Sequence, residues 1–192
     1  VAFCIVALAV VWVTNALLTE RFSESTRTRA DVRMTIYIGN LVSELQRNSI
    51  VPQLLARDPE LISALQSEDF SRSTQRLLSF VDEIGAASLI LLDDGGRVVA
   101  ATDRNRLGES NAEAAFFQDA RRASTTIFTT MEQPSGGNAF IYSRTISVGT
   151  TDLGVIAVEV DLAKLERAWA QTQDEIIVMN NEGRIILASA PR

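Results

Sequence analysis

Apolar and polar positions form one pattern that occurs twice along the chain. Residues 89–102 read LILLDDGGRVVAAT and residues 176–189 read IIVMNNEGRIILAS, and the two copies align without a gap. Each copy is an apolar run, a polar turn with glycine and a second apolar run, which is typical of a β-hairpin. A repeated unit predicts two similar domains in tandem. We expect residues 174–192 to be only the truncated start of the second domain.

The first 18 residues, VAFCIVALAVVWVTNALL, contain no charged side chain. A helix that spans the hydrocarbon core of a bilayer needs about 20 largely apolar residues, so we predict a transmembrane helix over residues 1–18. A cleaved signal peptide or a buried core helix would have a similar composition. We favour an uncleaved anchor, because the apolar run continues into an amphipathic helical pattern.

Helical segments are predicted to fill the lead-in, residues 19–87. From about residue 16 to residue 47 there is no proline, and apolar residues recur at helical spacing, which predicts one long helix emerging from the membrane. Asp58 is followed by proline, a combination typical of an N-cap and first helical position. We therefore expect a short helix over residues 59–66, and the apolar stripe that follows predicts another over residues 70–84.

The remaining pattern predicts an α+β fold with a PAS-like five-stranded antiparallel sheet over residues 88–173. We expect the long N-terminal helix to cover one face of this sheet, as layered folds require. We expect this sheet domain to be the membrane-distal one of the predicted pair. Its expected elements are strands over 88–93 and 97–102, a helix over 112–123, strands over 125–131, 139–148 and 153–160, and a helix over 162–173 capped by Asp161.

Composition excludes several classes of function. The formal net charge of −6 leaves no basic surface of the size that nucleic acid requires. The chain has no histidine, which excludes imidazole metal ligands and a Ser-His catalytic pair, and its single cysteine, Cys4, cannot form an internal disulfide. We therefore expect no catalytic residue, metal ion or cofactor within this chain.

Three strand residues are candidates for contact with a small ligand. Arg144 alternates with Tyr142 and Ile146, so all three side chains should share one face of the sheet. The guanidinium then either clamps an anion in a pocket or lies on the sheet surface beside an acid. Glu159 could be a pocket acid that selects an amine or a cation, although Val158 and Val160 facing the core would place it on the surface. The pattern slightly favours the surface for Glu159.

Helix and turn residues give further candidates, each with a structural alternative. Phe116 and Phe117 could line an apolar pocket, but they more often anchor a short helix to the core. Ser135 lies in a segment rich in turn-forming residues and could serve the turn alone. The pair Asp93 and Asp94 is better explained by the hairpin turn than by a metal site, because adjacent strand residues point to opposite faces.

The order of elements resembles the extracytoplasmic tandem PAS-like sensor module called double Cache or PDC. The stretches FIYSRTI (140–146) and GVIAVEVDLAKLE (154–166) are similar to that family's pattern. The stretches LLARDPELISALQ (54–66) and VDLAKLERAW (160–169) resemble the C4-dicarboxylate sensor histidine kinases of the DctB type. The resemblance implies a bacterial inner-membrane sensor with the residues after about 18 in the periplasm.

This resemblance also implies how such a sensor works and with which partners. A small solute, an organic acid or similar, binds the periplasmic region, and the signal crosses the membrane through helices of a homodimer. The parent protein would be a two-component histidine kinase that passes a phosphoryl group to a response regulator, and ATP would belong only to the kinase part. The same module also serves chemoreceptors and diguanylate cyclases, and a ligand-free dimerising scaffold is a further alternative.

The resemblance places the ligand contacts at positions where this chain departs from the family. An Arg and a Tyr in the family's R-P-Y-F stretch are matched by Ala114–Phe117, and a strand Lys is matched by Glu159. A Thr-Ser-Gly turn is matched in part at Ser135. Because a dicarboxylate needs cationic and hydroxyl donors, these departures argue against a dicarboxylate bound in the family's pose. The candidate ligand-binding residues are Phe116, Ser135, Tyr142, Arg144 and Glu159.

Overall fold

The computed structural model describes residues 30–132, 138–172, 175–179 and 183–189. The chain divides into two compact units, Val1–Ser43 and Glu44–Arg192. A helix covers residues 30–49, in agreement with the long helix expected there. No helix in these described ranges is both long and apolar enough to cross a membrane, and the transmembrane helix predicted over residues 1–18 lies outside them.

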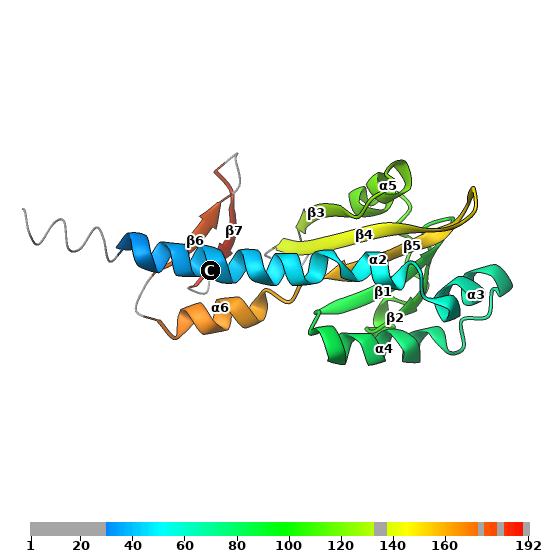
Figure 1. The fold of residues 1–192 in the computed structure, drawn as a ribbon, viewed down its shortest axis with the longest axis horizontal. Coiled ribbons are helices and arrows are strands. Elements are labelled where there is room, and N and C mark those ends of the chain that lie inside the picture. The colour runs from blue at the N-terminus through cyan, green and yellow to red at the C-terminus, as the bar shows by residue number, and fades with distance from the viewer. Residues whose placement is uncertain (1–29, 133–137, 173–174, 180–182, 190–192) are drawn as a thin grey trace, which may run out of the picture. The chain divides into compact units, whose positions relative to one another are not determined.

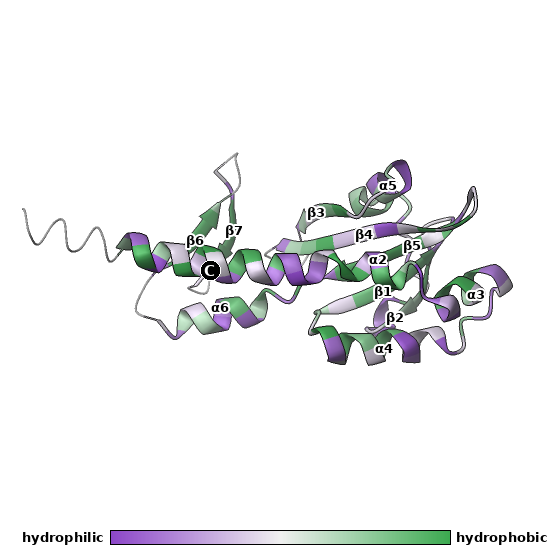
Figure 2. Ribbon diagram, in the orientation of Figure 1, coloured by the Kyte–Doolittle hydropathy of each residue, from purple (hydrophilic) through white to green (hydrophobic). Residues whose placement is uncertain are grey.

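The second unit contains the predicted five-stranded antiparallel sheet, with strand order β2-β1-β5-β4-β3 (Figure 1). This order brings the last strand, β5, to the centre beside the first, as expected of a PAS-like sheet. The strands are largely in the hydrophobic colour in Figure 2, whereas α4 and α5 show both colours. The strand bounds are β1 Ser88–Asp93, β2 Val98–Ala101, β3 Ile127–Glu132, β4 Asn138–Val148 and β5 Thr151–Glu159.

Three helices cover one face of the sheet: α2 (Val51–Leu55), α3 (Pro59–Ser67) and α4 (Ser73–Ile84). Within this unit they provide the cover that we expected from the long N-terminal helix. Helix α2 was not predicted, because Pro52 reads as a break; in the structure it occupies the first turn, where proline costs no hydrogen bond. The fully buried side chains of this layer include Leu55, Leu61 and Leu77 from the helices and Leu91 and Ile156 from the sheet.

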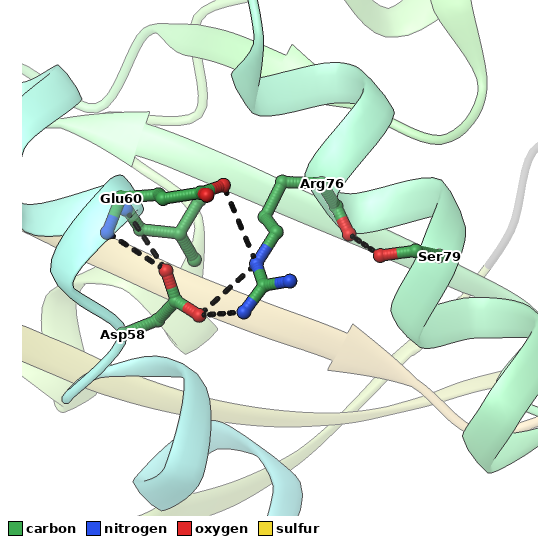
Figure 3. A network of polar contacts seen from close by, with 5 residues as sticks. Asp58, Glu60, Arg76 and Ser79 are labelled. Atoms are coloured by element: carbon green, nitrogen blue, oxygen red, sulfur yellow. Dashed lines mark hydrogen bonds and ion pairs between the residues drawn. The ribbon is translucent and has the colours of Figure 1, made fainter.

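The start of α3 confirms the predicted Asp58 cap and ties α3 to α4 (Figure 3). Asp58 Oδ1 accepts hydrogen bonds from the backbone N–H groups of Glu60 and Leu61, at 2.9 and 3.2 Å. Its other oxygen accepts from Arg76 Nη2 at 2.6 Å and from Arg76 Nε at 3.1 Å. The hydrogen bonds that Arg76 donates to Asp58 raise the pKa of Arg76, and the Arg76 guanidinium carbon also lies 4.6 Å from the centroid of the Phe80 ring. One buried carboxylate therefore orients two helices.

Helix α5 (Ala115–Arg122) covers the opposite face of the sheet (Figure 1). The 3-10 helix η1 (Arg104–Arg106) precedes it. Two hydroxyl groups on β4 hold α5 against the sheet: Ser143 Oγ donates to Phe116 O at 2.8 Å, and Thr145 Oγ1 donates to Ala120 O at 2.7 Å. Strand alternation consequently separates Ala139, Ile141 and Ser143, which face α5, from Tyr142 and Ile146, which pack against the core beneath α2–α4.

After β5 the chain forms α6 (Ala163–Ala170) and a second hairpin of β6 (Ile177–Met179) and β7 (Ile185–Ala188). The prediction that Asp161 caps α6 is wrong. The cap position is Leu162, with helical backbone angles and no side-chain cap hydrogen bond, because the helix begins one residue later than expected. The second hairpin pairs as predicted from the repeat, and its assignment to a second PAS-like domain stays a prediction.

Candidate ligand-binding site

The layer between α5 and the sheet is the first candidate for a ligand site, and it is a packed, apolar core. Phe116 and Phe117, adjacent in the first turn of α5, are 0% and 2% exposed, and both are packed into one core cluster with the sheet. The sheet contributes alanine and branched aliphatic side chains to this layer: Ile90, Leu92, Val98, Ala101, Ala139, Ile141, Val155 and Ala157. Phe116 is therefore a core residue, as the structural alternative predicted. It lies on the face of the sheet that a solute bound beneath α5 would contact.

Two buried polar atoms in the elements that surround this layer have no hydrogen-bond partner: Asn111 Nδ2 and Thr129 Oγ1. Asn111 lies in the loop before α5, where its backbone N–H donates to Gly96 O at 2.8 Å. Thr129 lies on β3 between Ile127 and Met131 on the inward-facing side, and Met131 packs against the core under α5. A buried donor or hydroxyl without a partner costs about 1–3 kcal/mol, so each is a place where a ligand or a water could bind.

Glu159 marks one end of the same face of the sheet. It lies two residues beyond Ala157 on β5 and opposite Ile141 on β4, both of which belong to the core under α5. Its Oε2 is 3.8 Å from Arg106 Nη1, and the side chains of Glu159 and Arg106 are only 20% and 24% exposed. The half-buried carboxylate of Glu159 thus forms an ion pair with the guanidinium of Arg106 in η1. The pair places one acceptor and one donor group at the rim of the apolar layer.

Tyr142 lies on the opposite face, the one covered by α2–α4, and packs against that core cluster. Its ring centroid is 5.0 Å from that of Phe128 on β3. Burial raises the pKa of the Tyr142 phenol. Because Ile146 is in the same cluster, the predicted alternation is confirmed, but the shared face is not the one beneath α5.

Arg144 lies at the edge of the sheet, beyond the last residue of β4 that pairs with β3. Its Nη2 donates a hydrogen bond to Ser124 O, in the segment after α5, at 3.1 Å. Ser135 lies outside the described residues. The structure therefore brings Phe116 and Glu159 to one face and places Tyr142 and Arg144 elsewhere, and the ligand roles of all five residues stay predictions.

Sequence reasoning did not find Asn111, Thr129 or Arg106. Thr129 sits in an alternating strand whose other inward positions are Ile127 and Met131, so a polar residue at a core position was a visible signal. Asn111 and Arg106 lie in a loop with many turn-forming residues, and nothing in their neighbours distinguishes them. Only the folded chain shows that the Asn111 amide is buried without a partner and that the Arg106 guanidinium lies 3.8 Å from Glu159.

Comparison with known proteins agrees with this architecture. The chain is 25% identical over 178 residues to the C4-dicarboxylate transport sensor protein DctB of Pseudomonas aeruginosa, a match that covers 88% of this chain and 28% of that protein. This chain thus spans well under half the length of that curated relative. No family model matches the chain.

Two solved structures show the same fold. The sensor domain of the V. cholerae histidine kinase DctB has a TM-score of 0.76 at 22% identity, over 85% of this chain and 67% of that one. The ligand-binding domain of the P. aeruginosa PAO1 amino acid chemoreceptor PctC, in complex with GABA, has a TM-score of 0.59 at 20% identity, over 80% of this chain and 71% of that one. Together with the match to the curated DctB protein, these likenesses confirm the resemblance to a DctB-type extracytoplasmic sensor region.

Proposed function

We propose that this chain is the periplasmic ligand-sensing region of a membrane-bound two-component sensor histidine kinase. The observation that carries the proposal is the match to DctB over 88% of the chain, together with a PAS-like sheet covered by a short helix. Residues 1–18 would anchor the region in the bacterial inner membrane. The kinase part, with its ATP and its response regulator, would lie in a part of the protein that this chain does not include.

The solute we propose is small, with an apolar body and at least one polar group. The apolar body would contact Phe116 and Phe117, and the polar group would satisfy Asn111 and Thr129. The residues that replace cationic family positions, Ala114 and Glu159, do not favour a dicarboxylate here. A neutral or zwitterionic solute with an amine would instead find a carboxylate at the rim, at Glu159.

A thermal-shift screen of the 192-residue chain against organic acids, amino acids and amines tests this function. A ligand that binds only the folded state stabilises it by about 2.7 kcal/mol at a concentration of 100 times Kd, so a true ligand raises the unfolding midpoint. Thr129→Val removes the buried hydroxyl and keeps the shape, and should reduce that rise. Thr130→Val is the matched control, because Thr130 is the exposed neighbour on the same strand.

The same screen and the identity of the output domain distinguish the competing functions. If no compound in any of the three classes raises the midpoint, the region does not sense such solutes, and a ligand-free dimerising scaffold becomes the better description. A rise with a dicarboxylate that Thr129→Val reduces would show that the interpretation of Ala114 and Glu159 is wrong. A chemoreceptor or a diguanylate cyclase would be recognised by its output domain, and the fold shared with PctC makes the chemoreceptor the first alternative.

Signal transfer is proposed to occur through the N-terminal helix as part of a homodimer. The described part of the first unit exposes several large apolar side chains, including Met34 at 62%, Ile38 at 50% and Val42 at 41%. These three are spaced four residues apart and therefore share one side of the helix. Ligand binding would shift the population toward one packing of the paired helices.

Sedimentation of the chain with and without ligand tests the dimer. Ile38→Lys should abolish self-association, because it places a charge on the apolar side of the helix. Asn40→Lys adds the same charge at an exposed polar position and should leave self-association intact. A monomer at high protein concentration under both conditions would exclude this mechanism.

A further inference from the structure

A groove of about 460 Å³ lies at the edge of the sheet, and its charged lining is dominated by arginine. Arg57 follows α2, Arg121 and Arg122 occupy the last turn of α5, and Arg144 lies on β4. Three elements far apart in the sequence thus bring four guanidinium groups to one groove. The chain as a whole carries a formal charge of −6, so this concentration of positive charge runs against its composition.

The groove contains a single acidic residue, Asp152, and it does not neutralise the arginines. Asp152 Oδ1 accepts a hydrogen bond from Ser147 Oγ at 2.7 Å. Among the described residues, no ion pair of 4 Å or less joins Asp152 to any of the four arginines. The positive potential inside the groove is therefore not cancelled from within it.

The arginines also retain most of their hydrogen-bonding capacity. Arg144 uses one donor on Ser124 O, Arg121 uses one on Asp94 O at 2.9 Å, and Arg122 lies 3.8 Å from Asp119 in an exposed pair. Arg57 is exposed and makes no side-chain hydrogen bond or ion pair with the described residues. A guanidinium has five N–H donors, so several donors remain for a bound group.

A structural explanation accounts for only part of this cluster. Arg121 and Arg122 lie in the last turn of α5, where a cation interacts favourably with the helix dipole. Arg57 lies beyond the end of a five-residue helix, and Arg144 is on a strand, so the helix dipole explains neither of them. Their presence in the same groove needs a different reason.

We propose that this groove binds a small dianion with oxygen acceptors, at a site separate from the apolar layer under α5. The planar fork of arginine matches the two oxygens of a carboxylate or a phosphate. The volume falls within the range of small-molecule pockets, about 300–1,000 Å³, so the occupant is a solute rather than a macromolecule. Phosphate groups and dicarboxylates share this chemistry, and the test distinguishes them.

Isothermal titration of the 192-residue chain with inorganic phosphate and with malonate, at pH 8 and constant ionic strength, tests the proposal. Saturable binding of at least one anion is expected. Arg57→Gln and Arg144→Gln should each weaken it about tenfold or more, the loss typical of one hydrogen bond to a charged group. Tighter binding of phosphate would assign the site to phosphate-bearing solutes, and tighter binding of malonate to dicarboxylates.

Two further variants distinguish a built site from general charge. Arg104→Gln removes the same charge at an exposed position outside the groove and should change the affinity less than twofold. Asp152→Asn removes the groove's only carboxylate and should strengthen anion binding several-fold. Absence of saturable binding by both anions, or an equal loss in Arg57→Gln and Arg104→Gln, would overturn the proposal. Solutes that bind under α5 should keep their thermal shift in Arg57→Gln, so this result is independent of the proposed function.

Discussion

The two copies of the repeated hairpin have the same internal geometry. Ile90 pairs with Ala101 and Ile177 with Ala188, and each hairpin has a register shift one residue further along, after Leu91 in one and Val178 in the other. The turn glycines Gly96 and Gly183 both adopt positive φ, 80° and 77°. A hydroxyl closes each hairpin: Thr102 Oγ1 accepts from Leu89 N at 3.0 Å, and Ser189 Oγ accepts from Ile176 N at 2.9 Å.

The surroundings of the two hairpins differ. Ile90 and Leu92 are 3% and 0% exposed, while the matching Ile177 and Met179 are 52% and 55% exposed. The first hairpin is part of a five-stranded sheet with a helical layer on each face, whereas the second forms a sheet of two strands. Hairpin geometry is therefore determined locally, by the turn glycine, the bulge and the hydroxyl. An isolated two-stranded hairpin is at best marginally stable, so its stability must come from whatever covers it.

The largest difference in stability between the two hairpins is expected when an apolar side chain is truncated to alanine. Leu92→Ala should lower the free energy of unfolding by about 2–5 kcal/mol, because it removes fully buried atoms and leaves a cavity. Met179→Ala, at the matching position, should change it by less than about 0.5 kcal/mol, as an exposed substitution does. Urea denaturation followed by far-UV circular dichroism measures both.

An equal cost for the two truncations would mean that Met179 is covered in solution. Dilution of the protein then distinguishes self-association from cover by the chain itself, because only self-association weakens with dilution. The comparison thus also tests whether the exposed apolar face of the second hairpin belongs to the monomer.

Alanine substitutions at the two turn glycines should differ less in their cost to the free energy of unfolding. A Cβ at Gly96 would lie 2.8 Å from Ala112 Cα and 2.9 Å from Ala112 N, both backbone atoms that cannot move aside easily. A Cβ at Gly183 would meet nothing within 4 Å. Gly96→Ala should therefore cost about 2–4 kcal/mol from its left-handed backbone and overpacking, and Gly183→Ala only the backbone share of about 1–2 kcal/mol.

Urea denaturation of both alanine variants measures this difference directly. Because the two glycines have nearly the same φ, the backbone cost is common to both, and the excess at Gly96 reports its contact with the loop before α5. If both variants lose the same stability, the loop at Ala112 does not pack against the turn in solution.

Features that depend on neighbours in the chain could be predicted from the sequence. The strands of both hairpins followed from two apolar runs on either side of a glycine turn, and the cap of α3 followed from Asp58 and the proline after it. The short helix α2 was missed because five residues give too little periodicity, and Pro52 was interpreted as the start of a new segment without a helix of its own. The predicted cap of α6 was wrong by one residue: the helix begins after Leu162, which makes no side-chain cap hydrogen bond, so no capping residue marks its start in the sequence.

Features that depend on distant parts of the chain could not be predicted. The alternation of Tyr142 with Ile146 was correct, but both faces of the sheet are apolar, so the pattern could not show which face α5 covers. The arginine groove assembles Arg57, Arg122 and Arg144 only when α2, α5 and β4 fold together. Likewise, the sequence could not show that the Thr129 hydroxyl is buried without a hydrogen-bond partner, because its burial depends on the layer beneath α5.

The smallest difference is expected for the hydroxyls that close the hairpins. Thr102→Val keeps the side-chain shape but leaves the backbone N–H of Leu89 without this acceptor inside the sheet, at a cost of about 1–3 kcal/mol. Ser189→Ala should cost less than about 1 kcal/mol, because the half-buried Ile176 can exchange its partner for water. Amide hydrogen exchange at Leu89 and Ile176 measures both losses at the affected bond. Equal acceleration of exchange at the two amides would show that local geometry alone protects them, and that the sheet around the first hairpin adds nothing to its closing bond.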